Sequence, residues 1–115
     1  MRVVLADDET EVRSALRLLL EEKSGVTLVA EAANETEMIA AVSASHPDLV
    51  LLDWELAPRG GGALLATLRA TWPTLIVIVL SSRPQAGLEA LAAGANAFVC
   101  KTDPLEQVLA AVREQ

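Results

Sequence analysis

Short aliphatic runs recur along the whole chain. They consist mainly of Val, Leu and Ile without alternating polar residues, a pattern typical of strands that are buried on both faces of a parallel sheet. The runs lie at residues 3–6, 27–30, 49–52, 75–80 and 97–100. Each run is followed by a longer segment of different periodicity, so the pattern predicts strands that alternate with helices.

The intervening segments carry apolar residues at helical spacing. We expect each apolar stripe to face the core. The stripes are Val12, Leu16, Leu19 and Leu20; Met38, Ile39 and Val42; Leu64, Leu65 and Leu68; Leu88, Leu91 and Ala92; and Leu105, Val108, Leu109 and Val112.

Glycine and proline residues fall between these elements, where chain breakers are expected. Gly94 is placed to end the fourth helix in a left-handed conformation, and Asp103-Pro104 to begin the fifth as its N-cap and first residue. We interpret the Gly60–Gly62 run as a flexible turn, because it matches no phosphate-binding loop. Strand–helix units in succession predict an α/β fold with a parallel sheet and helices on both faces.

Composition narrows the class of protein. The chain has 115 residues, of which 16 are acidic and 9 basic, and its net charge is −7. We expect residues 1–115 to form a single domain. The negative charge argues against direct nucleic-acid binding. No apolar run is long enough for a membrane span or has the form of a signal peptide, so we expect a cytoplasmic domain without membrane contact.

Polar residues follow four of the predicted strands directly. Asp7-Asp8 follow the first, Asp53 the third, Ser81-Ser82 the fourth and Lys101 the fifth. Ligands of open parallel sheets bind beyond the carboxyl ends of the strands. If the first and third strands are neighbours, three carboxylates converge, and two charges about 5 Å apart repel by about 3 kcal/mol at an effective dielectric constant of about 20. A hard divalent cation such as Mg²⁺ would relieve that repulsion.

These residue types suit phosphoryl transfer. A carboxylate beside a divalent cation acts as a nucleophile toward a phosphoryl group, and the reaction needs mainly positioning and neutralisation of charge. We predict an aspartyl phosphate on Asp53, with the cation, Lys101 and the Ser81 hydroxyl each binding a phosphoryl oxygen.

Taken one at a time, the same residues have ordinary structural explanations. Asp8 with Glu11 three positions later fits a helix cap. Asp53 alone fits a loop, and Lys101 alone fits a surface lysine. All of these explanations would have to hold together at four strand ends, which favours the functional interpretation.

The sequence resembles the receiver domain of two-component response regulators from Arg2 to about Arg113. The matching stretches are Val4–Asp8, Pro47–Asp53, Val79–Ser82, Ala93–Ala95 and Phe98–Lys101. The resemblance implies a flavodoxin-like (βα)5 fold with strand order 2-1-3-4-5. It also implies a switch that takes a phosphoryl group from the phosphohistidine of a histidine kinase or phosphotransfer protein, and that catalyses only its own phosphorylation and dephosphorylation.

Carried over to this sequence, the resemblance assigns a role to each site residue. Asp53 is the phosphoacceptor. Asp8 is a direct ligand of Mg²⁺ or Mn²⁺, Asp7 assists, and the backbone carbonyl of Glu55 completes the protein ligands. Ser81 and Lys101 bind the phosphoryl group, and Phe98 is the aromatic switch residue. Glu55 and Arg83 lie at the rim, and we expect an ion pair between them to slow hydrolysis.

Departures from the family pattern affect loops. Leu56-Ala57 precede Pro58 where the family usually has Met-Pro, and Arg59 precedes the glycine run. Thr102 follows Lys101 in place of a frequent proline. This feature and the Leu-rich first helix look most like receivers attached to LuxR-type DNA-binding domains. The resemblance thus implies transcription regulation through a separate output domain, and a homodimer that forms on phosphorylation.

Other functions stay open at this point. Asp53-Trp54-Glu55 imitates the Asp-x-Asp pair of an aspartyl-phosphate phosphatase of the haloacid dehalogenase type, although such enzymes carry their nucleophile after the first strand. A flavodoxin-like cofactor binder has a similar pattern of elements. A receiver that has lost phosphorylation and serves as a docking module is the last alternative.

Overall fold

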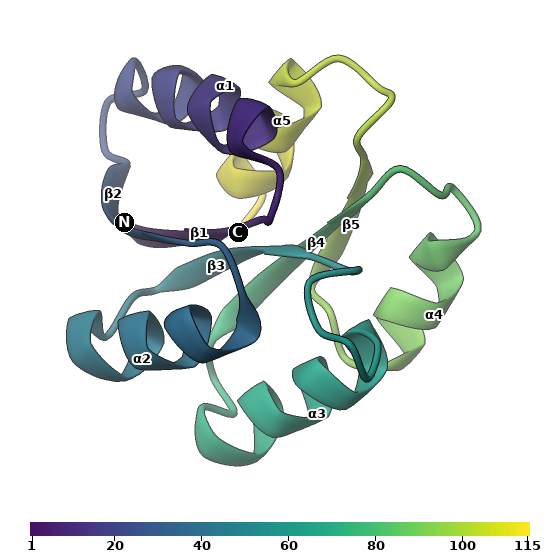
Figure 1. The fold of residues 1–115 in the computed structure, drawn as a ribbon. Helices are drawn as coiled ribbons and strands as arrows, with labels where there is room; N and C mark the ends of the chain where they lie inside the picture. The colour runs from purple at the N-terminus through teal and green to yellow at the C-terminus, as the bar shows by residue number, and fades with distance from the viewer.

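A computed structural model describes all residues, 1–115, as a three-layer α/β domain (Figure 1). All strands are parallel and follow the order β2-β1-β3-β4-β5. The strands are β1 (Arg2–Ala6), β2 (Thr27–Ala32), β3 (Leu49–Asp53), β4 (Ile76–Ser81) and β5 (Ala97–Cys100). The predicted fold class and strand order are confirmed.

Helices cover both faces of the sheet. Figure 1 shows α1 and α5 on one face and α2, α3 and α4 on the other. Their bounds are α1 (Thr10–Glu21), α2 (Glu35–Ser45), α3 (Gly61–Thr71), α4 (Ala86–Ala92) and α5 (Glu106–Arg113). None of them combines the length and the apolar character that a bilayer span requires.

Two apolar layers hold the helices to the sheet. Val4 and Ala6 of β1 belong to the layer under α2, α3 and α4, whereas Val3 and Leu5 belong to the layer under α1 and α5. Successive residues of a strand point to opposite faces, so a strand covered on both sides needs an apolar residue at every position. This requirement explains the unbroken aliphatic runs.

The predicted buried face of helix α4 is wrong. Leu88 is 82% exposed and Leu91 48% exposed, so the predicted stripe faces solvent. Ala86, Gly87 and Ala90 face the sheet instead. A Cβ atom on Gly87 would lie only 3.0 Å from the Phe98 ring. The helix lies so close to β5 that only small residues fit between them.

Two predicted loop features are also wrong. The glycine run is not a flexible turn: Gly60 precedes α3 with φ +94°, and Gly61 lies within the helix, where a Cβ would overlap the Trp54 ring. Asp103 does not cap α5, which begins at Glu106 after a turn in which the Gln107 N–H donates to the Pro104 carbonyl. Gly94, by contrast, has φ +108° directly after the end of α4, as predicted.

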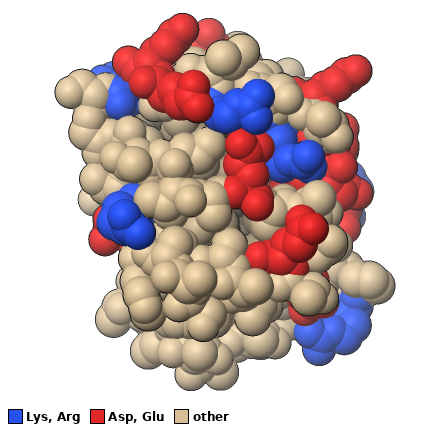
Figure 2. Space-filling view, turned by 60° about the vertical axis from the view of Figure 1, so that its left-hand side comes forward, with Lys and Arg blue, Asp and Glu red and all other residues tan.

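The surface carries charges of both signs. On the face drawn in Figure 2, basic side chains lie among acidic ones and form no continuous basic patch. Ion pairs of the molecule include Arg59 with Glu35 at 2.7 Å and Arg17 with Glu31 at 3.1 Å.

Candidate functional site: the acidic edge of the sheet

Three carboxylates meet at the carboxyl edge of the sheet. Strands β1 and β3 are hydrogen-bonded neighbours, so Asp7 and Asp8 after β1 lie beside Asp53 at the end of β3. One oxygen of each carboxylate lies within 4.8 Å of the others. The predicted convergence is confirmed. Asp8 does not cap α1, because that helix has Glu9 at its N-cap position and no side-chain cap.

Asp53 is a buried carboxylate with few partners. It is 1% exposed, and its Oδ1 accepts a hydrogen bond from the Glu55 backbone N–H at 3.0 Å. Burial, followed by repulsion from Asp7, raises the pKa of Asp53 from 3.8 to about 6, although Lys101 works in the opposite direction. The surroundings therefore destabilise the ionised form of Asp53, and a positively charged partner would stabilise it.

Lys101 supplies positive charge to the same edge. Its Nζ lies 2.8 Å from Asp7 Oδ2, 3.1 Å from Glu9 Oε1 and 3.4 Å from Asp53 Oδ1. Burial alone would lower the pKa of Lys101, but these carboxylates outweigh it and raise the pKa above its ordinary value. The sequence interpretation missed Glu9; its signal was a third acidic residue directly after Asp7-Asp8.

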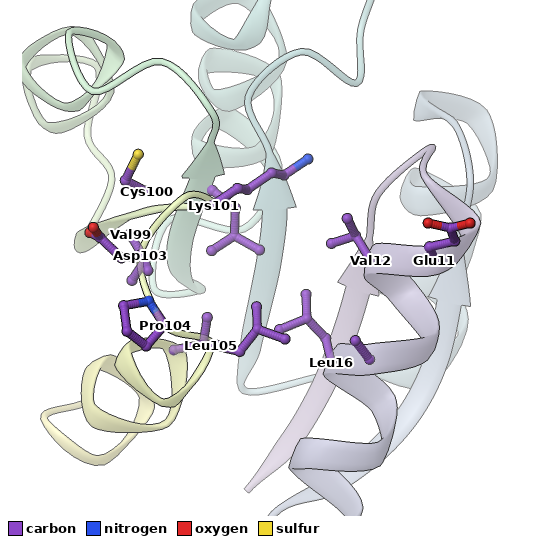
Figure 3. Close-up of a pocket in the computed structure, with 12 residues that line it drawn as sticks. Glu11, Val12, Leu16, Val99, Cys100, Lys101, Asp103, Pro104 and Leu105 are labelled. Atoms are coloured by element: carbon purple, nitrogen blue, oxygen red, sulfur yellow. The ribbon is translucent and has the colours of Figure 1, made fainter.

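The stem of Lys101 borders an apolar cavity. The cavity lies between α1 and α5 and has a volume of about 280 Å³. In Figure 3, Val12 and Leu16 of α1 face Val99 and Leu105 across it, and the Lys101 stem runs along its upper side. The lysine thus has apolar surroundings along its stem and carboxylates at its charged end.

The acidic cluster fits a hard divalent cation. Asp7 Oδ2 is buried and accepts no hydrogen bond, although it forms an ion pair with Lys101 Nζ at 2.8 Å. Asp8 is exposed and makes no side-chain hydrogen bond or ion pair, which leaves its oxygens open on the solvent side. Carboxylate oxygens in a group of this size are the ligands that Mg²⁺ and Mn²⁺ take in proteins.

Ser81, Glu55 and Arg83 form a connected group beside Asp53. The buried Ser81 hydroxyl donates to the Glu55 carboxylate, with Oγ 3.0 Å from Oε1 and 3.1 Å from Oε2, and Arg83 Nη2 lies 3.1 Å from Glu55 Oε2. The predicted ion pair of Glu55 and Arg83 is present in the structure. The hydrogen bond of Ser81 to Glu55 was not predicted, because spacing along the chain does not fix which way a serine hydroxyl turns.

Phe98 lies at the far side of this edge, on β5. It is half-buried and packs against the apolar layer under α4, with its ring against Gly87. Two residues further along β5, Cys100 is buried with Sγ 3.0 Å from Thr102 Oγ1. The predicted site residues thus occupy one edge of the sheet, and Phe98 borders it from the side of α4.

A parallel α/β domain with this acidic edge has the form of a phosphorylation-controlled signalling switch. The sequence matches the family model of the response regulator receiver domain over residues 3–113. The chain belongs to this family, the receiver domains of two-component systems. Receiver domains are signalling switches that generally use Mg²⁺, so the family supports the switch and not the phosphatase alternative.

Curated relatives of the chain are regulatory proteins. The chain is 30% identical to the oxygen regulatory protein NreC of Staphylococcus epidermidis over 98% of this chain and 53% of NreC. It is 33% identical to the uncharacterized transcriptional regulatory protein YhcZ of Bacillus subtilis, over 94% of this chain and 52% of YhcZ. The chain therefore spans about half the length of the curated relatives it matches.

Solved structures give the same fold. A LuxR-family two-component response regulator from Aurantimonas sp. SI85-9A1 has a TM-score of 0.90 at 28% identity, over 98% of this chain and 82% of that one. A CheY-like receiver domain protein from Methanospirillum hungatei has a TM-score of 0.82 at 25% identity, over 98% and 90% of the two chains. The resemblance to LuxR-type receivers is confirmed.

Proposed function

We propose that Asp53 is the phosphoacceptor of this receiver domain. The observation that carries the proposal is a buried carboxylate with a raised pKa, placed among three converging carboxylates and 3.4 Å from Lys101. Asp7 is also buried beside Lys101, so the choice of Asp53 rests in addition on the match of the stretch Pro47–Asp53 to the receiver family.

The step is a transfer between two nucleophiles. An Asp53 carboxylate oxygen attacks phosphorus, a new P–O bond forms, and the P–N bond of a phosphohistidine donor breaks. The leaving imidazole nitrogen keeps the electron pair of that bond. Lys101 Nζ neutralises one phosphoryl oxygen, and the Ser81 hydroxyl donates to another.

Asp8, Asp53 and the backbone carbonyl of Glu55 would hold Mg²⁺ or Mn²⁺, with Asp7 assisting. When bound, the cation supplies positive charge that offsets both the carboxylate cluster and the incoming phosphoryl oxygens. The Asp7 Oδ2 atom, which accepts no hydrogen bond, and the open oxygens of Asp8 support this assignment.

The partners follow from the class of protein. We infer a sensor histidine kinase or phosphotransfer protein as donor, and a LuxR-type DNA-binding domain as output. Residues 1–115 would act as one receiver domain that catalyses only its own phosphorylation and dephosphorylation. The output domain would make the DNA contacts. A homodimer formed on phosphorylation would involve the surface of the receiver.

Phosphoramidate, a small phosphoryl donor with a P–N bond, tests the assignment. With Mg²⁺ present, intact-mass spectrometry is expected to show one added phosphoryl group on the wild type and on Asp48→Asn, but none on Asp53→Asn. Asp48 is the matched control, because it lies just before the same strand and is exposed. Equal phosphorylation of Asp53→Asn would overturn the proposal.

The conformational response is tested with beryllofluoride, a mimic of the phosphoryl group. We expect Ser81 to turn toward the mimic and Phe98 to turn inward, because phenylalanine has no hydroxyl to desolvate. Structures with and without beryllofluoride in which both side chains keep their positions would contradict this expectation.

A further inference from the structure

The hydroxyl of Ser81 has a single proton, which it donates in a hydrogen bond to the Glu55 carboxylate. Ser81 is fully buried, and its Oγ lies 3.0 and 3.1 Å from the two Glu55 oxygens. The Arg83 backbone N–H donates to the same Oγ at 3.1 Å and so occupies one of its lone pairs. A hydroxyl donates one hydrogen bond at a time, so Ser81 cannot donate to a phosphoryl oxygen while it donates to Glu55.

Glu55 is itself fixed from two sides. Its backbone N–H donates to Asp53 Oδ1 at 3.0 Å, which places the residue directly beside the proposed phosphoacceptor. Its carboxylate pairs with the Arg83 guanidinium at 3.1 Å. The carboxylate that accepts the Ser81 proton is therefore held in place and does not drift into solvent.

We propose that Glu55 is a positioning residue that restrains Ser81 in the unphosphorylated conformation. This inference rests on the proposed function of Asp53. Phosphorylation must exchange the Ser81–Glu55 hydrogen bond for one to the phosphoryl group, so Glu55 opposes the switch by the free energy of that bond. Loss of the Glu55 carboxylate frees the hydroxyl and shifts the population toward the phosphoryl-bound arrangement.

Charge alone offers a competing explanation. Removal of any carboxylate near the site lowers the repulsion of an anionic phosphoryl group. Glu89 provides the matched control, because it lines the same groove as Glu55 and Arg83 but makes no hydrogen bond to Ser81 and no ion pair. Substitution of Glu89 by alanine removes one negative charge from this groove, as substitution of Glu55 does.

Beryllofluoride binding in the presence of Mg²⁺ is the measurement. The fluorescence of Trp54, which adjoins Asp53, reports the titration of the full chain. Glu55→Ala is expected to bind beryllofluoride about tenfold tighter than wild type, the ratio that corresponds to one hydrogen bond to a charged group. Glu89→Ala is expected to change the affinity less than about twofold.

The double variant isolates the role of Ser81. In a Ser81→Ala background, Glu55→Ala is expected to change the affinity less than about twofold, because no hydroxyl remains to be released. A second readout needs no ligand: the amide resonance of Arg83, whose N–H donates to Ser81 Oγ, is expected to shift in Glu55→Ala and not in Glu89→Ala.

Each contrary result has a distinct meaning. An equal gain in affinity with and without the Ser81 hydroxyl, or no gain at all, overturns the inference while leaving the proposed function intact. A wild-type protein that binds no beryllofluoride with Mg²⁺ overturns the proposed function and this inference together. The Glu55 side chain is 43% exposed, and loss of its hydrogen bond to the buried Ser81 is expected to lower the melting temperature by about 5 °C, which leaves the alanine variant folded.

Discussion

Two aspartates flank β3, and they differ in almost every physical respect. Asp48 precedes the strand and is exposed; its Oδ2 accepts a hydrogen bond from the Arg2 backbone N–H at 2.7 Å. Asp53 ends the strand, is 1% exposed, and faces Asp7 and Lys101. The first carboxylate joins β3 to β1, whereas the second raises the energy of the folded state unless a positive partner compensates it.

The difference comes from the two edges of a parallel sheet. At the amino edge, Asp48 continues the ladder, since its N–H donates to the Arg2 carbonyl and its carbonyl accepts from Ile76. At the carboxyl edge, the loops separate and side chains from several strands share one space. An acidic residue therefore joins two strands at the amino end of β3, whereas at the carboxyl end its charge destabilises the folded state without a positive partner.

The largest expected effect is a gain in stability from Asp53→Asn without metal. A pKa raised to about 6 corresponds to at most about 3 kcal/mol at neutral pH. We expect Asp53→Asn to raise the free energy of unfolding in chelator by about 1–3 kcal/mol. Asp48→Asn is expected to lower it by at most about 1 kcal/mol, since it weakens one hydrogen bond. Urea unfolding of the three proteins measures both changes, and identical curves would refute the contrast.

The pH dependence sharpens the same contrast. Because the pKa of Asp53 is about 6 in the folded protein and 3.8 as a free group, the folded state binds more protons between these values. The penalty is therefore full above pH 6 and disappears as the pH falls toward 4. In chelator, the advantage of Asp53→Asn over wild type is expected to shrink over this range. An advantage that stays constant from pH 7.5 to 4.5 would contradict the assignment.

Mg²⁺ is expected to act at one end of β3 only. A cation that binds the folded state stabilises it by about 1.4 kcal/mol at ten times its dissociation constant. Wild type and Asp48→Asn are expected to gain equally in thermal melts with Mg²⁺, and Asp53→Asn to gain much less. A gain of similar size in all three proteins would place the cation elsewhere.

The smallest expected effect concerns the rim pair. Glu55 and Arg83 have side chains 43% and 46% exposed, so their ion pair contributes little to stability, about 0–1 kcal/mol. We expect its loss to act on water access: Glu55→Ala and Arg83→Ala each speed autodephosphorylation about two- to fivefold at fixed Mg²⁺, with little further gain in the double variant. Unchanged rates in all three variants would end this interpretation.

Much of this molecule could be predicted from its sequence. The aliphatic runs locate the strands because both faces of the sheet are covered, and the polar residues after four strands locate the site because parallel strands end at one edge. These signals are set by backbone geometry. They therefore place Asp7, Asp8, Asp53 and Lys101 together without knowledge of any rotamer.

The errors share a different physical origin. Leu88 and Leu91 form an apolar stripe, but Gly87 and the small residues around it allow α4 to approach Phe98 more closely, and that contact decides which face is buried. Gly61 lies within α3 at a position that requires glycine, because the Trp54 ring occupies the space a side chain would need. Contacts between residues distant in sequence override local patterns in both places.

The Glu55–Ser81 contact has no sequence signal for a related reason, and the acidic run that includes Glu9 does not show that Glu9 reaches Lys101. Both depend on the direction of a side chain at the end of a loop. The ion pair of Glu55 with Arg83 was accessible, because two positions at equal offsets on neighbouring strands carry opposite charges. The hydroxyl proton that joins them has no signal in the sequence.

The central position of β1 has a consequence for synthesis on the ribosome. Although β1 is the first strand of this domain to be made, it pairs with both β2 and β3, so one of its edges stays without a partner until the chain has been made as far as Asp53. At about 5–20 residues per second, this takes about 3–10 s. During this time an apolar strand with an open edge is exposed to pairing with other chains. Slow translation of α2 and β3 would lengthen that interval, and a chaperone that covers residues 2–6 would protect the nascent chain.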